Sequence, residues 1–378
     1  MLLGLYITRL VHTQGRFQVV VKPLAEQPEE LLARRLPLIS VIIPARNEAR
    51  NIYRCIQALL RQTYPHFELI VVDDRSSDET PHILAEQADA DARISVIHGT
   101  ELPKGWAGKP HALVQGAESA RGEWLCFMDA DTFAHPDLLF AAYLEANENQ
   151  ADMFSILSRQ ELGTFWERTV LPLVFMGLSF GFPVERVNDP ARPEAISNGQ
   201  FILIRRGVYD QIGGHASVKD RIDEDKALAI VVKQAGFRLI LADGRQVAST
   251  RMYTSLPEMW EGWTKNIYLG LRDRLWLLLF GAVLGLLVSI LLPLWLVGGL
   301  IWLAAGGGMV ASVVVIEALI LWGFLLEKRL HACQEFGIHS GYAFTFPLGA
   351  LIFTAMMVAS VYKVVSGRGV SWKGRHYR

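Results

Sequence analysis

The sequence predicts an α/β domain with a mostly parallel sheet, followed by helices that cross a membrane. Two observations lead to this prediction. Between residues 30 and 270, short apolar runs alternate with helical segments and end in polar residues, which is the pattern of a doubly wound parallel sheet. From residue 275 to residue 362 the chain is mostly apolar. The 378 residues carry a net charge of −1, so the composition does not suggest a nucleic-acid partner.

Four continuous apolar runs are the expected parallel strands. They are Leu38–Ile43, Phe67–Val72, Ile94–His98 and Trp124–Met128, with helices expected at about 49–63, after residue 78 and at 111–119. Because the carboxyl ends of parallel strands meet at one edge of a sheet, the polar residues that follow these strands should line a ligand site. Further elements are expected later: helices at 137–147 and 226–234, and strands at 152–157, 197–206, 237–241 and 246–250.

The fourth run leads directly into Asp129-Ala130-Asp131. Two carboxylates at this spacing suit a hard divalent cation that bridges phosphate oxygens. A solvated acidic turn is the alternative for this pair taken alone. Two other polar groups have similar alternatives, namely a helix N-cap with an extra turn acid for Asp73 and Asp74, and a surface position for Lys109.

Three acids, Asp223, Glu224 and Asp225, precede the helix expected at 226–234. Acids at a helix N-terminus gain from the macrodipole, and that alone accounts for their presence. A carboxylate is also suited to accept a proton from an attacking hydroxyl group near neutral pH. Both interpretations stay open for these residues on sequence pattern alone.

Four motifs follow one another along the expected sheet. They are P-A-R-N-E at 44–48, V-V-D-D-R-S-S-D at 71–78, G-K-P-H-A-L at 108–113 and D-A-D at 129–131. In this order they resemble the motifs of the family 2 glycosyltransferases of GT-A fold, and the resemblance covers about residues 38–265. It implies a GT-A nucleotide-sugar-binding domain with a Rossmann-like sheet. It also implies a nucleotide-sugar donor, a UDP-sugar in particular, with Mg²⁺ or Mn²⁺ as cofactor.

The resemblance implies a role for each motif. The donor-binding residues would be Pro44, Ala45, Arg46, Glu48, Asp73, Asp74, Lys109, Asp129 and Trp263. Asp131 and Asp129 would ligate the metal, with Asp129 also near the ribose or sugar of the donor. The catalytic Glu-Asp pair of the family matches Glu224 and Asp225, and Asp225 is the expected base.

Residues 256–274 are predicted to form an amphipathic helix at a membrane surface. Apolar residues recur there at helical spacing: Met259, Trp260, Trp263, Ile267 and Leu271. The resembled family often carries Q-x-x-R-W at this place, whereas this chain has M-W-E-G-W at 259–263 and keeps only the final tryptophan. This departure argues against a processive polysaccharide synthase, and it leaves Lys265 as a substitute cation.

Three segments are long enough to span a membrane, at 276–297, 300–326 and 342–362. A break is expected at Gly298-Gly299, and a water-exposed end at Glu327-Lys328-Arg329. Val170–Val184 is apolar but short and contains prolines, so it is expected to be interfacial or buried and not to cross. The tail is basic, which favours a cytoplasmic position, but three spans would place it outside. The number of spans therefore stays open.

These predictions describe five regions and one function. The regions are an N-terminal interfacial segment and linker (1–36), the GT-A catalytic domain (37–255), the amphipathic helix (256–274), the transmembrane helices (275–364) and a basic tail (365–378). The expected protein is an inverting hexosyltransferase of the cytoplasmic membrane, multi-pass, with its catalytic domain in the cytoplasm and a lipid as acceptor.

The acceptor class is suggested by two further stretches. L-P-K-G-W-A-G-K at 102–109 and W-K-G-R-H-Y at 372–377 resemble transferases associated with carotenoid and hopanoid pathways. One alternative is a polyprenyl-phosphate sugar transferase, in which a phosphate is the acceptor. The other is a non-catalytic membrane scaffold with a decayed transferase domain.

Overall fold

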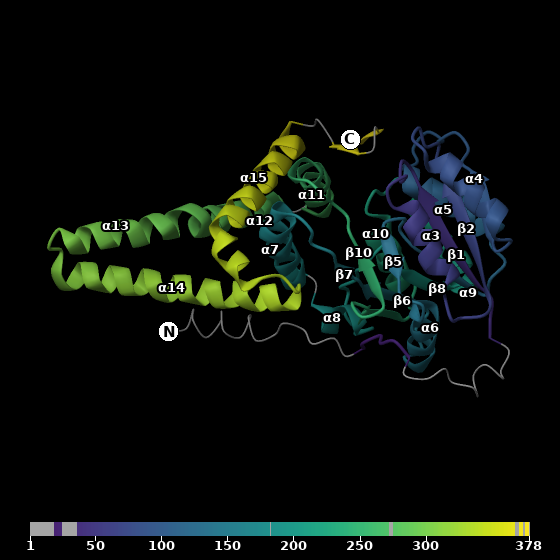
Figure 1. Cartoon of the computed structure of the whole chain (residues 1–378), viewed down its shortest axis with the longest axis horizontal. Coiled ribbons are helices and arrows are strands. Elements are labelled where there is room, and N and C mark those ends of the chain that lie inside the picture. The colour runs from purple at the N-terminus through teal and green to yellow at the C-terminus, as the bar shows by residue number, and fades with distance from the viewer. Residues whose placement is uncertain are drawn as a thin grey trace. The chain divides into compact units, whose positions relative to one another are not determined.

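A computed structural model describes residues 19–24, 36–181, 183–271, 275–366, 370–372 and 375–377 (Figure 1). The chain divides into two compact units. The first unit comprises residues 1–161 and 179–252, and the second comprises residues 162–178 and 253–378. Most of the N-terminal interfacial segment and linker expected at 1–36 lies outside the described residues, as do residues 367–369, 373–374 and 378 of the basic tail.

The first unit is built on a seven-stranded sheet with the strand order β3-β2-β1-β4-β8-β6-β9. Its strands are β1 (Ile39–Ala45), β2 (Phe67–Asp73), β3 (Ile94–His98), β4 (Trp124–Phe127), β6 (Met153–Leu157), β8 (Ile202–Arg205) and β9 (Leu239–Asp243). Only β8 runs antiparallel to its neighbours, β4 and β6. The other pairs are parallel. The prediction of a mostly parallel α/β sheet is therefore confirmed.

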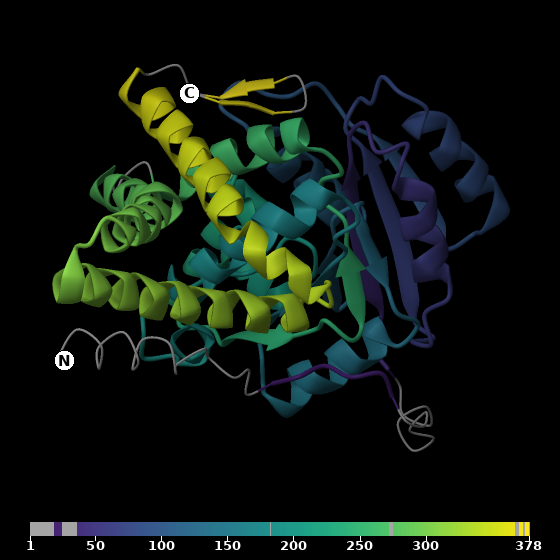
Figure 2. The ribbon, with the colours of Figure 1, turned by 60° about the vertical axis from the view of Figure 1, so that its left-hand side comes forward.

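Helices cover both faces of this sheet (Figures 1 and 2). They are α3 (Ile52–Leu60), α4 (Thr80–Ala90), α5 (Gly108–Ser119), α6 (Leu138–Glu148), α8 (Val184–Asn188), α9 (Arg206–Gln211) and α10 (Glu224–Gln234). Alternate residues of β1 enter two separate cores: Val41 and Ile43 pack with α3, α4 and α6, whereas Ile42 packs with α5, α9 and α10. A strand that is buried on both faces needs a continuous apolar sequence, which is what the expected strands have.

A small second sheet follows the Asp129-Ala130-Asp131 turn. It contains β5 (Thr132–Ala134), β10 (Ala248–Thr250) and β7 (Arg159–Gln160) in that order. The hydroxyl of Thr250 donates a hydrogen bond to the carbonyl oxygen of Asp131 at 3.0 Å. Thr250, the last residue of β10, therefore holds the Asp129-Ala130-Asp131 turn in place.

The strand expected at 197–206 is wrong in its first half. β8 begins only at Ile202, because the residues before it hydrogen-bond outside any strand ladder. The hydroxyl of Ser197 donates to the carbonyl oxygen of Asp225 at 2.7 Å, and the backbone N–H of Asn198 donates to the hydroxyl of Ser155 at 2.9 Å. Residues 197–200 therefore form a loop that precedes β8 and is hydrogen-bonded to Ser155 on β6 and to Asp225 on α10.

The second unit is helical apart from one short hairpin. Its elements are α7 (Phe165–Gly181), α11 (Leu256–Leu271), α12 (Leu275–Leu286), the π-helical segment η3 (Leu287–Leu291), α13 (Leu292–Ala304), α14 (Gly308–Glu335), η4 (Ser340–Thr345), α15 (Phe346–Val365), β11 (Val370–Trp372) and β12 (Arg375–Tyr377). Among the described residues, three helical segments are long and apolar enough to cross a membrane: Leu279–Ala304, Gly308–Glu335 and Ser340–Lys363. α7 is not one of them.

The break expected at Gly298-Gly299 is wrong. α13 continues through both glycines to Ala304, and the chain turns at Gly306 and Gly308, whose φ angles are +88° and +58°. A Cβ added at Gly299 would lie 3.1 Å from the Cγ2 of Val315 on α14. Gly299 therefore allows two long helices to approach each other instead of ending one.

The water-exposed end expected at Glu327-Lys328-Arg329 is also wrong for its last residue. α14 continues to Glu335, and Arg329 is only 1% exposed. Glu327 and Lys328 form an ion pair of 2.9 Å with each other. Arg329 instead points into the interior of the second unit, where it meets α7.

α11 has a narrower apolar face than the spacing predicts. Met259, Trp263 and Ile267 are buried, whereas Trp260 is 38% exposed. The hydroxyl of Ser360 on α15 donates to the carbonyl oxygen of Thr264 on α11 at 2.7 Å. Protein therefore covers the apolar face of this helix, at least where it packs against α15.

Candidate active site

The loops that follow β1 and β2 are joined by hydrogen bonds at the carboxyl edge of the sheet. The guanidinium of Arg46 donates to the carbonyl oxygen of Asp74 at 2.7 Å. The backbone N–H of Asn47 donates to the hydroxyl of Ser76 at 3.0 Å, and Asn47 has a φ of +53°. The first two motifs of the sequence therefore form one continuous wall.

Asp73 and Asp74 are both buried in this wall, each about 5% exposed. The Oδ1 atom of Asp73 accepts a hydrogen bond from the backbone N–H of Ser76 at 3.0 Å. α4 begins only at Thr80, and its N-cap residue is Glu79. The alternative in which these two acids cap a helix is therefore wrong.

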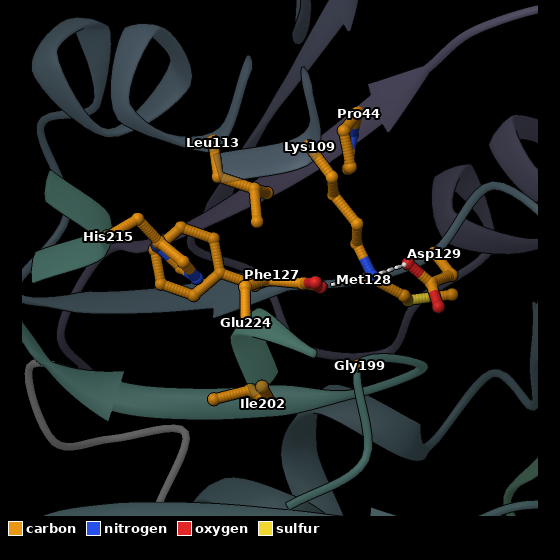
Figure 3. Close-up of a pocket in the computed structure, with 10 residues that line it drawn as sticks. All are labelled: Pro44, Lys109, Leu113, Phe127, Met128, Asp129, Gly199, Ile202, His215 and Glu224. Carbon is orange, nitrogen blue, oxygen red and sulfur yellow. Dashed lines mark ion pairs between the residues drawn. The ribbon is translucent and has the colours of Figure 1, made fainter. Parts of the chain in front are cut away.

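Lys109, in the first turn of α5, joins two of the expected motifs. Its Nζ atom lies 2.6 Å from Oδ1 of Asp129 and 2.6 Å from Oε1 of Glu224 (Figure 3). The side chain of Glu224 is 4% exposed, and that of Lys109 is 34% exposed. Lys109 is therefore not a surface lysine. It links the residues after β4 to the start of α10.

Burial and neighbouring charges shift the pKa values of Lys109, Glu224 and Asp225. Burial raises the pKa of Glu224 to about 7, although Lys109 opposes the shift. Burial also raises the pKa of Asp225. Burial by itself would lower the pKa of Lys109, but the carboxylates of Asp129, Glu224 and Asp225 hold it well above its ordinary value. The ammonium group therefore stays charged while it compensates several acids.

Asp225 is held by backbone donors on both carboxylate oxygens. Its Oδ2 accepts from the N–H of Gly199 at 3.0 Å, and its Oδ1 accepts from the N–H of Lys226 at 2.7 Å. A Cβ added at Gly199 would lie 2.8 Å from Nζ of Lys109 and 3.4 Å from carboxylate oxygens of Asp129 and Asp225. Gly199 therefore lies close to Lys109, Asp129 and Asp225, and its lack of a side chain leaves room for them.

A small pocket opens among these residues. Its lining, shown in Figure 3, is Pro44, Lys109, Leu113, Phe127, Met128, Asp129, Gly199, Ile202, His215 and Glu224. The structure therefore brings four of the expected site residues, Pro44, Lys109, Asp129 and Glu224, into one cavity wall. Trp263, expected to bind the donor, belongs to α11 of the second unit.

His215 is a pocket residue that sequence reasoning missed. It follows Gly213 and Gly214, which both have positive φ, and its ring packs edge-on against Phe127 with centroids 4.6 Å apart. A Cβ on Gly214 would lie 2.4 Å from the ring of Tyr209. The paired glycines were a usable signal, because they allow the turn that places His215 against Tyr209.

The hydroxyl of Tyr209 is hydrogen-bonded to the backbone and to the ring of His215. It accepts from the backbone N–H of His215 at 3.1 Å and lies 3.0 Å from Nδ1. Burial, and the charge of Lys109, lower the pKa of His215 to about 3, so the imidazole is neutral. The phenolic hydroxyl and Nδ1 therefore share one hydrogen bond, and the other ring nitrogen is Nε2. That atom is buried and has no hydrogen-bond partner among the described residues.

Comparisons with known proteins point to one family. Residues 40–213 match the family model of Glycosyl transferase family 2. The chain is 28% identical over 265 residues to 4,4'-diaponeurosporenoate glycosyltransferase of Staphylococcus aureus (strain USA300), covering 67% of this chain and 69% of that protein. It is 36% identical over 118 residues to the uncharacterized glycosyltransferase EpsJ of Bacillus subtilis (strain 168), covering 31% and 33%.

A solved structure shows the same fold over nearly the whole chain. It is the mannosyltransferase PcManGT from Pyrobaculum calidifontis, in complex with GDP-Man and Mn²⁺, with 19% sequence identity and a TM-score of 0.55. The match covers 96% of this chain and 94% of that one. The expected resemblance is thereby confirmed, and the alternative of a non-catalytic scaffold is not supported. The chain is a glycosyltransferase, and its residues 40–213 are similar to the family 2 model.

Proposed function

We propose that this glycosyltransferase moves a hexose from a nucleotide-sugar donor, a UDP-sugar in particular, to a lipid acceptor, with inversion at the anomeric carbon. The observation that carries the proposal is the cluster of Lys109, Asp129, Glu224 and Asp225, in which a cation lies beside buried carboxylates at the carboxyl edge of the sheet. A cation suits a diphosphate leaving group, and a carboxylate suits proton removal.

The donor would lie along the wall made by the first two motifs. Pro44, Ala45, Arg46 and Glu48 would line the nucleotide pocket, and Asp73 or Asp74 would bind its base and ribose. The hydrogen bonds that join the two loops support this assignment, because they hold the wall in place before the donor arrives. Lys109 would move from Asp129 toward the diphosphate.

A divalent metal fits the residues present. Among the described residues, no group of three or more histidine, cysteine or acidic side chains could hold a metal alone. Asp131 and Asp129 would therefore supply two hard oxygen ligands, and the diphosphate and water would supply the others, as is usual for Mg²⁺. When bound, Mg²⁺ or Mn²⁺ would neutralise charge on the departing nucleoside diphosphate.

Asp225 is the proposed base. Its two backbone hydrogen bonds orient the carboxylate, while burial favours its protonated form. The acceptor hydroxyl would give its proton to Asp225 as its oxygen attacks the anomeric carbon from the face opposite the leaving group. The new glycosidic bond would form as the bond to the diphosphate breaks.

A lipid acceptor is supported by two findings. The described residues include three helical segments long and apolar enough to cross a membrane, and one relative is named a 4,4'-diaponeurosporenoate glycosyltransferase. We place the protein in the cytoplasmic membrane with its catalytic domain, residues 37–255, in the cytoplasm. The amphipathic helix (256–274) and the membrane helices (275–364) would hold this domain at the lipid surface.

Mass spectrometry of lipid extracts tests the proposal. Cells that express the full chain should contain a lipid whose mass is increased by one hexose, and cells that express Asp225→Asn should lack it. A new hexosylated product that is water-soluble, with no change among the lipids, would overturn the choice of acceptor.

The metal assignment has its own test. Asp131→Ala should abolish the Mn²⁺-dependent part of UDP-sugar binding to the full chain in nanodiscs, measured by calorimetry with and without chelator. Asp210→Ala, at an exposed position on α9, is the control and should bind as the wild type does. Unchanged metal dependence in Asp131→Ala would remove Asp131 from the site.

A further inference from the structure

Arg329 is a buried cation of the second unit that the proposed chemistry does not use. It lies on α14, one of the segments long and apolar enough to span a membrane, and is 1% exposed. One terminal nitrogen donates to the carbonyl oxygens of Arg168 at 2.5 Å and of Thr169 at 3.2 Å on α7. A charge in such a segment is costly unless it serves a site.

The contact with α7 has a local cause. Pro172 lies inside α7 and has no N–H, so the carbonyl of Arg168 loses the hydrogen bond that a helix makes between residues i and i−4. Arg329 supplies the missing donor. This explains one nitrogen of the guanidinium, but a carbonyl is neutral and does not balance the charge.

The rest of the guanidinium has no partner. Its Nε and second terminal nitrogen are buried and make no hydrogen bond among the described residues, and the same holds for the hydroxyl of Thr169. Glu327, the nearest acid along α14, pairs instead with Lys328 at 2.9 Å. Arg329 forms no ion pair with any residue that the structure describes.

From these contacts we infer that Arg329, together with the hydroxyl of Thr169, binds the acidic head group of a lipid, either a carboxylate or a phosphate. An oxyanion would supply the missing charge and accept from the three unused N–H groups. A lipid acid is inferred because Arg329 follows, on the same helix, the stretch of α14 that is long and apolar enough to cross a membrane. The inference rests on the proposed lipid acceptor, which would carry this acidic group in addition to the hydroxyl that attacks the donor.

The surroundings suit the apolar part of such a ligand. α7 and α14 meet again farther along, where the rings of Phe175 and Phe336 lie 5.8 Å apart, about 9 Å of helix beyond Thr169. Phe175 also packs edge-on against Trp263 at 5.9 Å, and the indole N–H of Trp263 is buried without a described partner. An aromatic surface with a further free donor therefore continues from the guanidinium.

Lipid binding without any nucleotide sugar tests this inference. The full chain in phosphatidylcholine nanodiscs is titrated with oleic acid, oleyl phosphate and oleyl alcohol. We expect the wild type to bind at least one of the two acids about tenfold more tightly than the alcohol. Arg329→Gln should bind all three within about twofold of one another, whereas Lys328→Gln, which removes the neighbouring cation on α14, should keep the preference.

Two further measurements distinguish a lipid acid from a free anion, and a loss of binding from a loss of folding. Acetate or inorganic phosphate at the same concentration should not displace the bound acid, and displacement would overturn the lipid source. If Arg329→Gln does not fold, Thr169→Val keeps the shape and should still weaken acid binding about threefold. A wild type without preference for acids overturns the inference.

The result is also separable from the proposed function. A wild-type enzyme that glycosylates a lipid alcohol without preferring acids leaves the proposed function standing and overturns the acid site. An enzyme that binds lipid acids through Arg329 but transfers sugar to no lipid supports the site and overturns the proposed acceptor.

Discussion

Each unit of the molecule contains a cation that contacts other parts of its own unit, and the two are neutralised differently. Lys109 in the first unit is partly buried, and Arg329 in the second is fully buried. Lys109 in the first unit lies 2.6 Å from two carboxylates, those of Asp129 and Glu224. Among the residues that the structure describes, the guanidinium of Arg329 in the second unit donates hydrogen bonds only to two carbonyl oxygens. Lys109 is compensated within the protein, whereas Arg329 is not.

This difference in charge compensation determines how each cation can bind a ligand. A lysine that is already paired stays compensated when it exchanges one carboxylate for a diphosphate, and the carboxylate that it leaves, Asp129, can then bind the metal that accompanies the donor. An arginine that meets only carbonyls gains most from an anion that comes from outside the chain. The predictions that follow change the Lys109 cluster one group at a time.

The largest effect is expected from removing the proposed base. Asp225→Asn keeps the size of the side chain but cannot take the acceptor proton, and it loses one of the two backbone hydrogen bonds because an amide has a single acceptor oxygen. Turnover should therefore fall by about 10²–10⁴-fold. Affinity for the nucleotide sugar should change little, because ground-state binding is retained. Steady-state kinetics with the lipid acceptor measure both quantities.

The neighbouring acids provide the graded controls. Glu224→Gln should lower turnover less than Asp225→Asn does, and Asp223→Asn should lower it least, since Asp223 pairs with Arg221 at 2.8 Å. An inactive Glu224→Gln enzyme beside a nearly normal Asp225→Asn enzyme would move the base one residue upstream.

Removing the cation tests the other side of the cluster. Lys109→Met leaves Asp129, Glu224 and Asp225 without their counter-ion and without a charge for the diphosphate, so turnover should fall about 10²–10³-fold. Donor affinity should weaken as well, which separates this variant from Asp225→Asn. Lys104→Met, at an exposed lysine in the loop that precedes α5, should behave as the wild type. Equal activity of the two methionine variants would show that Lys109 has no part in the reaction.

The elements that could be predicted were those fixed by local sequence. β2 was expected at Phe67–Val72 and is found at Phe67–Asp73, because a strand buried on both faces must be continuously apolar. The acids after β4 and at the start of α10 were also placed correctly at strand and helix ends, although α10 begins at Glu224, two residues earlier than expected. That Lys109 would join Asp129 to Glu224 could not be predicted, because this contact depends on how three separate elements pack.

The predictions that were wrong also depend on how separate elements pack. The run before β8 was expected to be strand, but distant partners, Ser155 and Asp225, hold it as a loop. Arg329 stands in a charged triplet, which predicts a water-exposed end. Its burial depends on carbonyls freed by Pro172, 157 residues earlier in the chain. Sequence periodicity carries no information about such long-range hydrogen bonds.

A smaller effect is expected from the imidazole beside the cation. The folded pKa of His215, about 3, lies below its ordinary value of 6.5. The unfolded chain therefore binds the extra proton between these values, and stability is lost as the pH falls below 6.5. Between pH 7 and pH 5 this should cost about 2 kcal/mol of the free energy of unfolding.

The variant His215→Gln should lack this loss. Thermal unfolding of the full chain in detergent at pH 7 and pH 5 measures the difference between variant and wild type. His82→Gln, at an exposed histidine, should follow the wild type at both pH values. If His215→Gln and the wild type lose equal stability, then His215 is not held neutral by its surroundings.

The smallest change tests how closely the cluster is packed. Gly199 has no side chain, and a Cβ there would lie 2.8 Å from Nζ of Lys109, so Gly199→Ala should displace the ammonium by a few tenths of an ångström or more. Misplacement of a charged group on this scale should lower turnover about tenfold. Gly207→Ala is the matched control, because nothing lies within 4 Å of its added Cβ. Turnover in Gly199→Ala equal to that of Gly207→Ala would show that the lysine tolerates displacement, and that its carboxylate contacts, rather than its position, are what the reaction needs.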